Sequence, residues 1–141
     1  MCILEVIDLQ KHYGHEPNIT HALNGISFKV TEGEFVGIMG PSGSGKTTLL
    51  NCISTIDTPT SGQIHLDGRD LLQVKERDLA RFRRENLGFV FQDFNLLDTL
   101  TIHENIALAL TINKESPKRI DTRVKDIAVR LGIQQGQGKH P

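Results

Sequence analysis

The nine residues GPSGSGKTT, at positions 40 to 48, constrain the fold of this chain more than any other stretch. The first eight satisfy the pattern G-x-x-x-x-G-K-[ST] in full. The apolar segment EFVGIMG, residues 34–40, leads into the glycines, and Leu49, Leu50 and Ile53 follow at helical spacing on one face. Because a nearly all-apolar run is typical of a strand covered on both faces, this order predicts a buried strand, a glycine-rich loop and a helix.

The glycine-rich loop has the residue types that a chain of phosphates needs. Gly40, Gly43 and Gly45 carry no Cβ, so the backbone can curl with its N–H groups pointing inward. The helix that starts near Gly45 offers free N–H groups and the positive end of its dipole. Lys46 adds a point charge, and the hydroxyl of Thr47 can ligate Mg²⁺. The predicted phosphate-binding residues are Gly40, Pro41, Ser42, Gly43, Ser44, Gly45, Lys46, Thr47 and Thr48.

The rest of the chain predicts an α/β protein with antiparallel strands at its start. Predicted strands and helices alternate only in the middle of the chain, which is why the first strands are expected to be antiparallel. Thr101 and Glu104 form a capping-box pattern at the start of one helix. The predicted strands are residues 2–13, 21–30, 34–40, 63–68 and 87–92, and the predicted helices are residues 74–86, 101–110 and 119–132.

Length, charge and cysteine content narrow the class of protein. The chain has 141 residues, which suits one domain, and its formal net charge of −1 gives no overall basic field that would attract nucleic acid. No apolar stretch approaches the ~18 residues that cross a bilayer, and the N-terminus lacks the pattern of a secretory signal. Cys2 and Cys52 form no CxxC pair, which favours two reduced thiols.

A phosphate-binding loop by itself does not identify the enzyme. A GTPase would carry the guanine-reading sequence N-K-x-D, whereas NKES at residues 113–116 lacks the carboxylate. The loop alone is also compatible with a small-molecule kinase, but no segment that would form a substrate lid is evident in the sequence. The segments that flank the loop decide between these classes.

Four segments resemble the N-terminal part of the ATP-binding subunits of ABC transporters. They are KHYG, ALNGISFKVTEGEFVGIMGPSGSGKTTLLN, PTSGQIHLDG and FVFQDFNLLDTLTIHENI, and they stand in the order of that family. The resemblance runs from Ile3 to about Pro141, which is essentially the whole chain. STIDTPTSG and FQDFNLLDTLT are most similar to bacterial exporters of the bacitracin-resistance and macrolide or lipoprotein type.

The resemblance implies an incomplete P-loop NTPase fold of the ABC ATPase type, with ATP and Mg²⁺ as cofactors. Residues 1–92 would form the P-loop core and an antiparallel β subdomain, and residues 93–141 would start a helical subdomain. In this family an aromatic residue at the position of Tyr13 stacks on adenine. Gln92 matches a glutamine that touches Mg²⁺ or the attacking water, so it is the candidate catalytic residue and, with Thr47, a candidate metal ligand.

The resemblance also implies partners and a place in the cell. The family's ATP-binding subunits dimerise on binding ATP and drive a transmembrane permease subunit at the cytoplasmic face of the membrane, without nucleic acid. The implied function is the ATP-binding (ATPase) subunit of a transporter that exports a peptide-like or antimicrobial compound.

Two features of the family are absent from the 141 residues. Neither L-S-G-G-Q nor four apolar residues followed by Asp-Glu occurs. We therefore expect a P-loop half-site on a fragment or truncated gene product, and the alternative is a truncated, non-catalytic nucleotide-binding fragment. Because apolar strands without neighbours invite aggregation, we also expect the isolated chain to be poorly soluble or partly molten.

Overall fold

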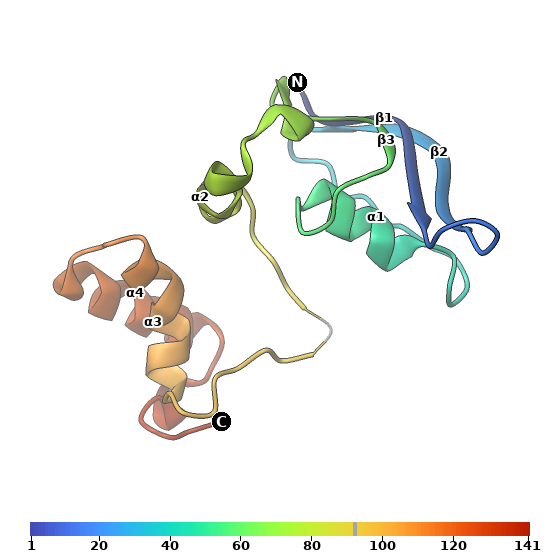
Figure 1. Ribbon diagram of the computed structural model, residues 1–141. Coiled ribbons are helices and arrows are strands. Elements are labelled where there is room, and N and C mark those ends of the chain that lie inside the picture. Colours follow the sequence, from blue (N-terminus) through green and yellow to red (C-terminus); the bar gives the residue numbers. More distant parts are fainter. Residues whose placement is uncertain (92) are drawn as a thin grey trace. The chain divides into compact units, whose positions relative to one another are not determined.

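The computed structural model describes residues 1–91 and 93–141. It divides the chain into two compact units, Met1–Leu87 and Gly88–Pro141 (Figure 1). The first unit contains an antiparallel sheet, the glycine-rich loop and two α-helices, whereas the described residues of the second unit form helices and loops.

The sheet of the first unit has four strands: β1 (Cys2–Tyr13), β2 (Thr20–Thr31), β3 (Ser61–Leu66) and β4 (Arg69–Asp70). Their order is β2-β1-β3-β4, and the neighbours pair antiparallel. Val6 of β1 is opposite Phe28 of β2 and Ile64 of β3, so apolar pairs cross the middle of the sheet. The structure thus confirms the antiparallel start of the chain and three of the five predicted strands.

Two α-helices and a 3-10 helix complete the core of the first unit. α1 (Lys46–Ile53) lies along one face of the sheet (Figure 1). The 3-10 helix Leu71–Gln73 and α2 (Glu76–Asn86) follow the sheet. Each fully buried aliphatic side chain stabilises such a core by ~1.5–3 kcal/mol. The buried core residues are Val6, Leu9, Leu23, Leu49, Cys52, Ile64, Leu71, Val74 and Phe82.

The buried face of α1 differs from the prediction at one position. Leu49 is buried and Ile53 packs against the core, but Leu50 is 55% exposed. Cys52 takes the expected place of Leu50 in the core. The reason is that residues three and four apart share a helix face, whereas adjacent residues point about 100° apart.

The second unit contains two packed helices, α3 (Ile102–Ile112) and α4 (Pro117–Arg130). The predicted capping box is confirmed, since Glu104 N donates to Thr101 Oγ1 at 3.2 Å and Thr101 N donates to the Glu104 carboxylate at 2.7 Å. α4 starts two residues before its predicted start, because proline suits the first position of a helix. None of the described helices combines the length and apolar composition that a membrane span requires. The buried residues of α3 and α4 are Ala107, Val124 and Ala128.

Two predicted strands do not form in the described part of the chain. Residues 34–40 and 87–91 have no regular secondary structure. Leu87 packs partly against the core, but other apolar side chains of these segments are exposed, with Phe35 at 99%, Met39 at 94% and Val90 at 102%. A strand needs a neighbour that pairs with its N–H and C=O groups, and the order β2-β1-β3-β4 includes neither segment. The prediction of buried strands here is wrong for this structure.

Candidate phosphate-binding site

The glycine-rich loop continues directly into α1. Ser44 N donates to the Pro41 carbonyl at 3.2 Å, which closes a turn within the loop. Gly45 is the N-cap residue, and α1 begins at Lys46. The Gly45 carbonyl accepts the first bond of the helix, from Leu49 N at 2.8 Å. The predicted succession of loop and helix is therefore confirmed, although the segment that leads into it is not a strand.

Two positions in the loop require glycine. Gly45 has a φ of 91°, and a Cβ there would also collide with the Ala22 carbonyl oxygen of β2. Gly43 has a φ of 80°, a left-handed conformation that favours glycine, although a Cβ there would meet no other atom. The loop thus lies tightly against β2 at Gly45, where a larger residue would have to displace the backbone.

The Lys46 ammonium is held against the backbone of the loop. Its Nζ donates to the carbonyl oxygens of Gly40 at 2.8 Å and Pro41 at 2.6 Å, and more weakly to Ser44 Oγ at 3.4 Å. All three acceptors are neutral. A phosphate oxygen can therefore replace these acceptors of the Lys46 ammonium without an ion pair having to break first.

The N-terminus of α1 adds a second source of positive potential. No side chain from residues 1–91 or 93–141 caps this terminus, and the first turn contains no acidic residue. Thr47 is exposed and Thr48 is half-buried in that turn. Because uncapped N–H groups and the helix dipole both attract anions, the terminus and the Lys46 charge together fit a chain of phosphates.

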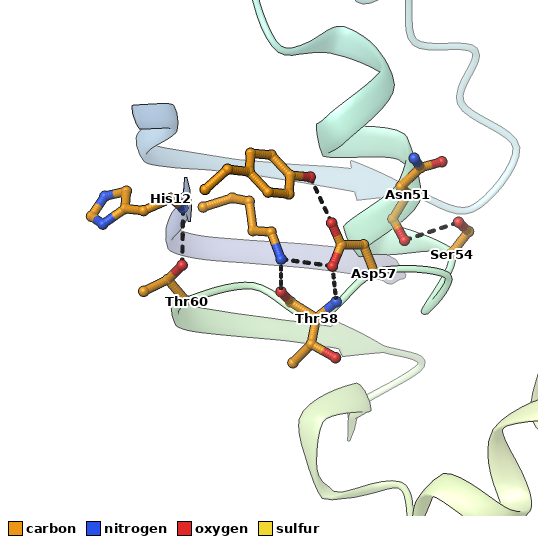
Figure 2. A network of polar contacts seen from close by, with 8 residues as sticks. His12, Asn51, Ser54, Asp57, Thr58 and Thr60 are labelled. Atoms are coloured by element: carbon orange, nitrogen blue, oxygen red, sulfur yellow. Dashed lines mark hydrogen bonds and ion pairs between the residues drawn. The ribbon is translucent and has the colours of Figure 1, made fainter. Parts of the chain in front are cut away.

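Tyr13, the predicted base-stacking residue, lies at the end of β1 and is 42% exposed. Its hydroxyl donates to Asp57 Oδ2 at 2.6 Å, and Lys11 Nζ donates to Asp57 Oδ1 at 2.6 Å (Figure 2). The bond to Asp57 raises the pKa of the Tyr13 phenol, while the side chain of Thr48 acts on this pKa in the opposite sense. Asp57 N in turn donates to the Asn51 carbonyl of α1 at 3.1 Å, so the Tyr13 hydroxyl is linked to this helix through Asp57.

The sequence patterns did not indicate Asp57 or Lys11 as neighbours of the site. Asp57 follows Tyr13 by 44 residues and belongs to a stretch that the sequence marks only as a turn. The one sequence pattern that indicates a contact between Lys11 and Tyr13 is their spacing of two along a strand, since residues two apart share a strand face. Gln92, the predicted catalytic residue, lies outside the described residues.

Comparison with known proteins identifies the family. A family model described as "ABC transporter" matches residues 23–141. The bacitracin export ATP-binding protein BceA of Halalkalibacterium halodurans is 49% identical over 141 residues, which are 100% of this chain and 56% of that protein. The ABC transporter ATP-binding protein YxdL of Bacillus subtilis is 55% identical over 132 residues, which are 94% of this chain and 51% of that protein.

A solved structure agrees with these relatives. The dimeric ATP-binding cassette MJ0796, in a post-hydrolysis state bound to ADP and Pi, matches with a TM-score of 0.89 and 34% identity, over 99% of this chain and 62% of that chain. The fold is therefore that of an ATP-binding cassette. The chain belongs to the ABC transporter family, which confirms the resemblance in its sequence. It spans about half the length of the relatives BceA and YxdL.

Proposed function

We propose that the glycine-rich loop and α1 bind ATP, and that the chain is the ATP-binding part of an exporter-type ABC transporter. The observation that carries the nucleotide proposal is the Lys46 ammonium beside the N-terminus of α1, where every acceptor that it meets among the described residues is neutral. BceA is named for bacitracin export, and this supports a peptide-like or antimicrobial compound as the transported substrate.

In this proposal the backbone N–H groups of Gly43 and residues 45–48 hold the phosphates, and Lys46 exchanges its carbonyl bonds for bonds to the terminal phosphate oxygens. The Tyr13 ring stacks on the adenine. Among the described residues no group of three His, Cys, Asp or Glu side chains could hold a metal ion, so the Thr47 hydroxyl and the phosphate oxygens would hold Mg²⁺. Bound Mg²⁺ supplies charge neutralisation of the phosphates.

Hydrolysis and transport are proposed on the family alone. Gln92 would contact Mg²⁺ or the attacking water. A second ATP-binding subunit would complete the site, which the dimeric structure of MJ0796 supports, and a transmembrane permease at the cytoplasmic face of the membrane would use the energy. Because the 141 residues contain no L-S-G-G-Q, we propose that this chain alone binds ATP without turning it over at the rate of a complete cassette.

Calorimetric titration with ATP and Mg²⁺ tests the proposed site. Lys46→Ala should weaken binding by ~10–100-fold, because a hydrogen bond between charged groups contributes about 1.5–3 kcal/mol. Thr47→Ala should mainly reduce the dependence of binding on Mg²⁺. Lys75→Ala is the matched control, since Lys75 is an exposed lysine of the same unit at the start of α2.

Unchanged affinity in Lys46→Ala would overturn the assignment of the loop as a phosphate site. An equal loss in Lys75→Ala would mean that overall charge, and not the loop, governs binding. Robust Mg²⁺-dependent turnover by the wild-type chain, abolished by Lys46→Ala, would contradict the proposal that the chain alone does not hydrolyse ATP.

A further inference from the structure

Three side chains at the end of β1 form a polar cluster that the phosphate site does not use. The Asp57 carboxylate accepts from the Tyr13 hydroxyl with one oxygen and from Lys11 Nζ with the other, both at 2.6 Å (Figure 2). Lys11 Nζ also lies 4.8 Å from the centre of the Tyr13 ring, over one face of it. The Lys11 and Asp57 side chains are only 13% and 29% exposed.

Hydrogen bonds on two sides fix the position of Asp57 and the residues that follow it. Asp57 N donates to the Asn51 carbonyl of α1 at 3.1 Å, which ties the residue to the helix that follows the glycine-rich loop. Lys11 Nζ donates to the Thr58 carbonyl at 2.7 Å, and Thr60 N donates to the Gln10 carbonyl at 2.8 Å, which tie the next residues to β1. The carboxylate is thus held between α1 and the end of β1.

The Asp57 carboxyl stays ionised although it is partly buried. Burial works against the ionised carboxyl, but the bonds from Lys11 and Tyr13 outweigh burial, so the pKa of Asp57 is lowered. The bond to Asp57 likewise raises the pKa of the Lys11 ammonium. Both groups are therefore charged near neutral pH, and the Tyr13 hydroxyl donates a charge-assisted hydrogen bond.

We propose that Asp57, paired with Lys11, is a positioning residue that holds the Tyr13 ring ready to stack on the base of a bound nucleotide. The inference rests on the proposed function, because it concerns the ring that would meet adenine. The carboxylate anchors the phenol at its hydroxyl end, and the ammonium covers one face of the ring. Because Tyr13 is 42% exposed, part of the ring is accessible to a base, and a ring that is already ordered loses less entropy when the nucleotide binds.

The composition of the chain allows a direct optical test of the contact. Tyr13 is the only tyrosine and there is no tryptophan, so tyrosine absorbance and fluorescence report on this ring alone. In a pH titration followed by phenolate absorbance, Asp57→Asn should lower the apparent pKa of Tyr13 relative to the wild type. The charged and polar groups around the phenol are Asp57 after α1, Lys11 on β1 and Thr48 on α1.

Binding of two probes, ATP and inorganic triphosphate, separates the positioning role from the phosphate site. Asp57→Asn and Tyr13→Phe should each weaken ATP binding about 2- to 10-fold, the range for one lost hydrogen bond, and leave triphosphate binding unchanged. The double variant should bind ATP about as well as either single variant, since both substitutions remove the same contact. Asp67→Asn is the matched control, because Asp67 lies at a turn between β3 and β4 and its φ of 49° suits asparagine.

The outcomes separate this inference from the proposed function. If Lys46→Ala weakens both probes while Asp57→Asn and Tyr13→Phe leave the ratio of ATP to triphosphate affinity unchanged, the phosphate site stands and the positioning role is overturned. A changed ratio in Asp57→Asn without one in Tyr13→Phe would also overturn it, because Asp57 would then act by another route. Far-UV circular dichroism and retained triphosphate binding exclude misfolding as the cause of a loss.

Discussion

Two sets of apolar segments in this chain are similar in composition and opposite in outcome. Val6 and Leu9 of β1 and Ile64 of β3 are at most 1% exposed, whereas Phe35, Met39 and Val90 are at least 94% exposed. The first set belongs to strands that pair with neighbours, and the second lies in segments without regular structure. The comparison teaches that apolar composition makes a segment able to form a buried strand, and a paired neighbour decides whether it does so.

The physical reason is the hydrogen-bonding demand of the backbone. Burying an apolar strand removes its N–H and C=O groups from water, and each group left without a partner costs about 1–3 kcal/mol. β1 meets this demand on both edges, with β2 on one side and β3 on the other. Residues 34–40 and 87–91 have no such neighbours in the described sheet, so no strand ladder satisfies their N–H and C=O groups.

The largest expected effect is in amide hydrogen exchange. The amides of Val6 and Ile64 should exchange on the order of 1000-fold or more slowly relative to those of Val36 and Val90, because the former open only on unfolding of the sheet. Exchange measured by NMR or mass spectrometry checks this difference. Comparable protection in both sets would break the comparison, since it would mean that the two segments pair in solution.

The next largest effect is on the free energy of unfolding, when valine is replaced by alanine in a paired strand and in an exposed segment. Val6→Ala should lower the free energy of unfolding by about 1.5–3 kcal/mol, because it removes two buried methyl groups and leaves a cavity. Val90→Ala should change it by less than about 0.5 kcal/mol, as is usual for exposed sites. Urea denaturation measures both. A large loss in Val90→Ala would contradict the exposure of this segment.

The smallest expected effect is the contribution of Asp57, which links α1 to the paired strand β1, to the free energy of unfolding. The pKa of Asp57 is lowered on folding, so its stabilisation is present above the usual carboxyl pKa of about 4 and is lost as pH falls through the folded-state value. Since the side chain is 29% exposed, we expect only about 0.2–1 kcal/mol.

Wild type and Asp57→Asn should therefore differ in unfolding free energy at neutral pH and converge in acid. A difference that persists after the carboxyl is protonated would show that the charge of Asp57 is not the stabilising element. Asp67→Asn is again the control, and it should show a smaller difference at every pH.

Much of the candidate site was predictable because its signals are local. The glycines and Lys46 occur within one short stretch, and the capping box of Thr101 and Glu104 spans one helical turn, so the sequence predicts both. Other features were not predictable. Leu50 looked equivalent to its apolar neighbours, and the contact of Asp57 with Tyr13 joins residues 44 positions apart.

The sequence by itself determined the succession of glycine-rich loop and helix, the antiparallel start of the chain and its membership of the ABC transporter family. Each of these depends on residue types at short spacing, where backbone sterics and adjacent hydrogen bonds act directly. Only the tertiary structure decided which apolar segments became buried strands and which side chains surround Tyr13. Strand pairing and burial depend on partners distant in the sequence, and no local pattern specifies whether such a partner is at hand.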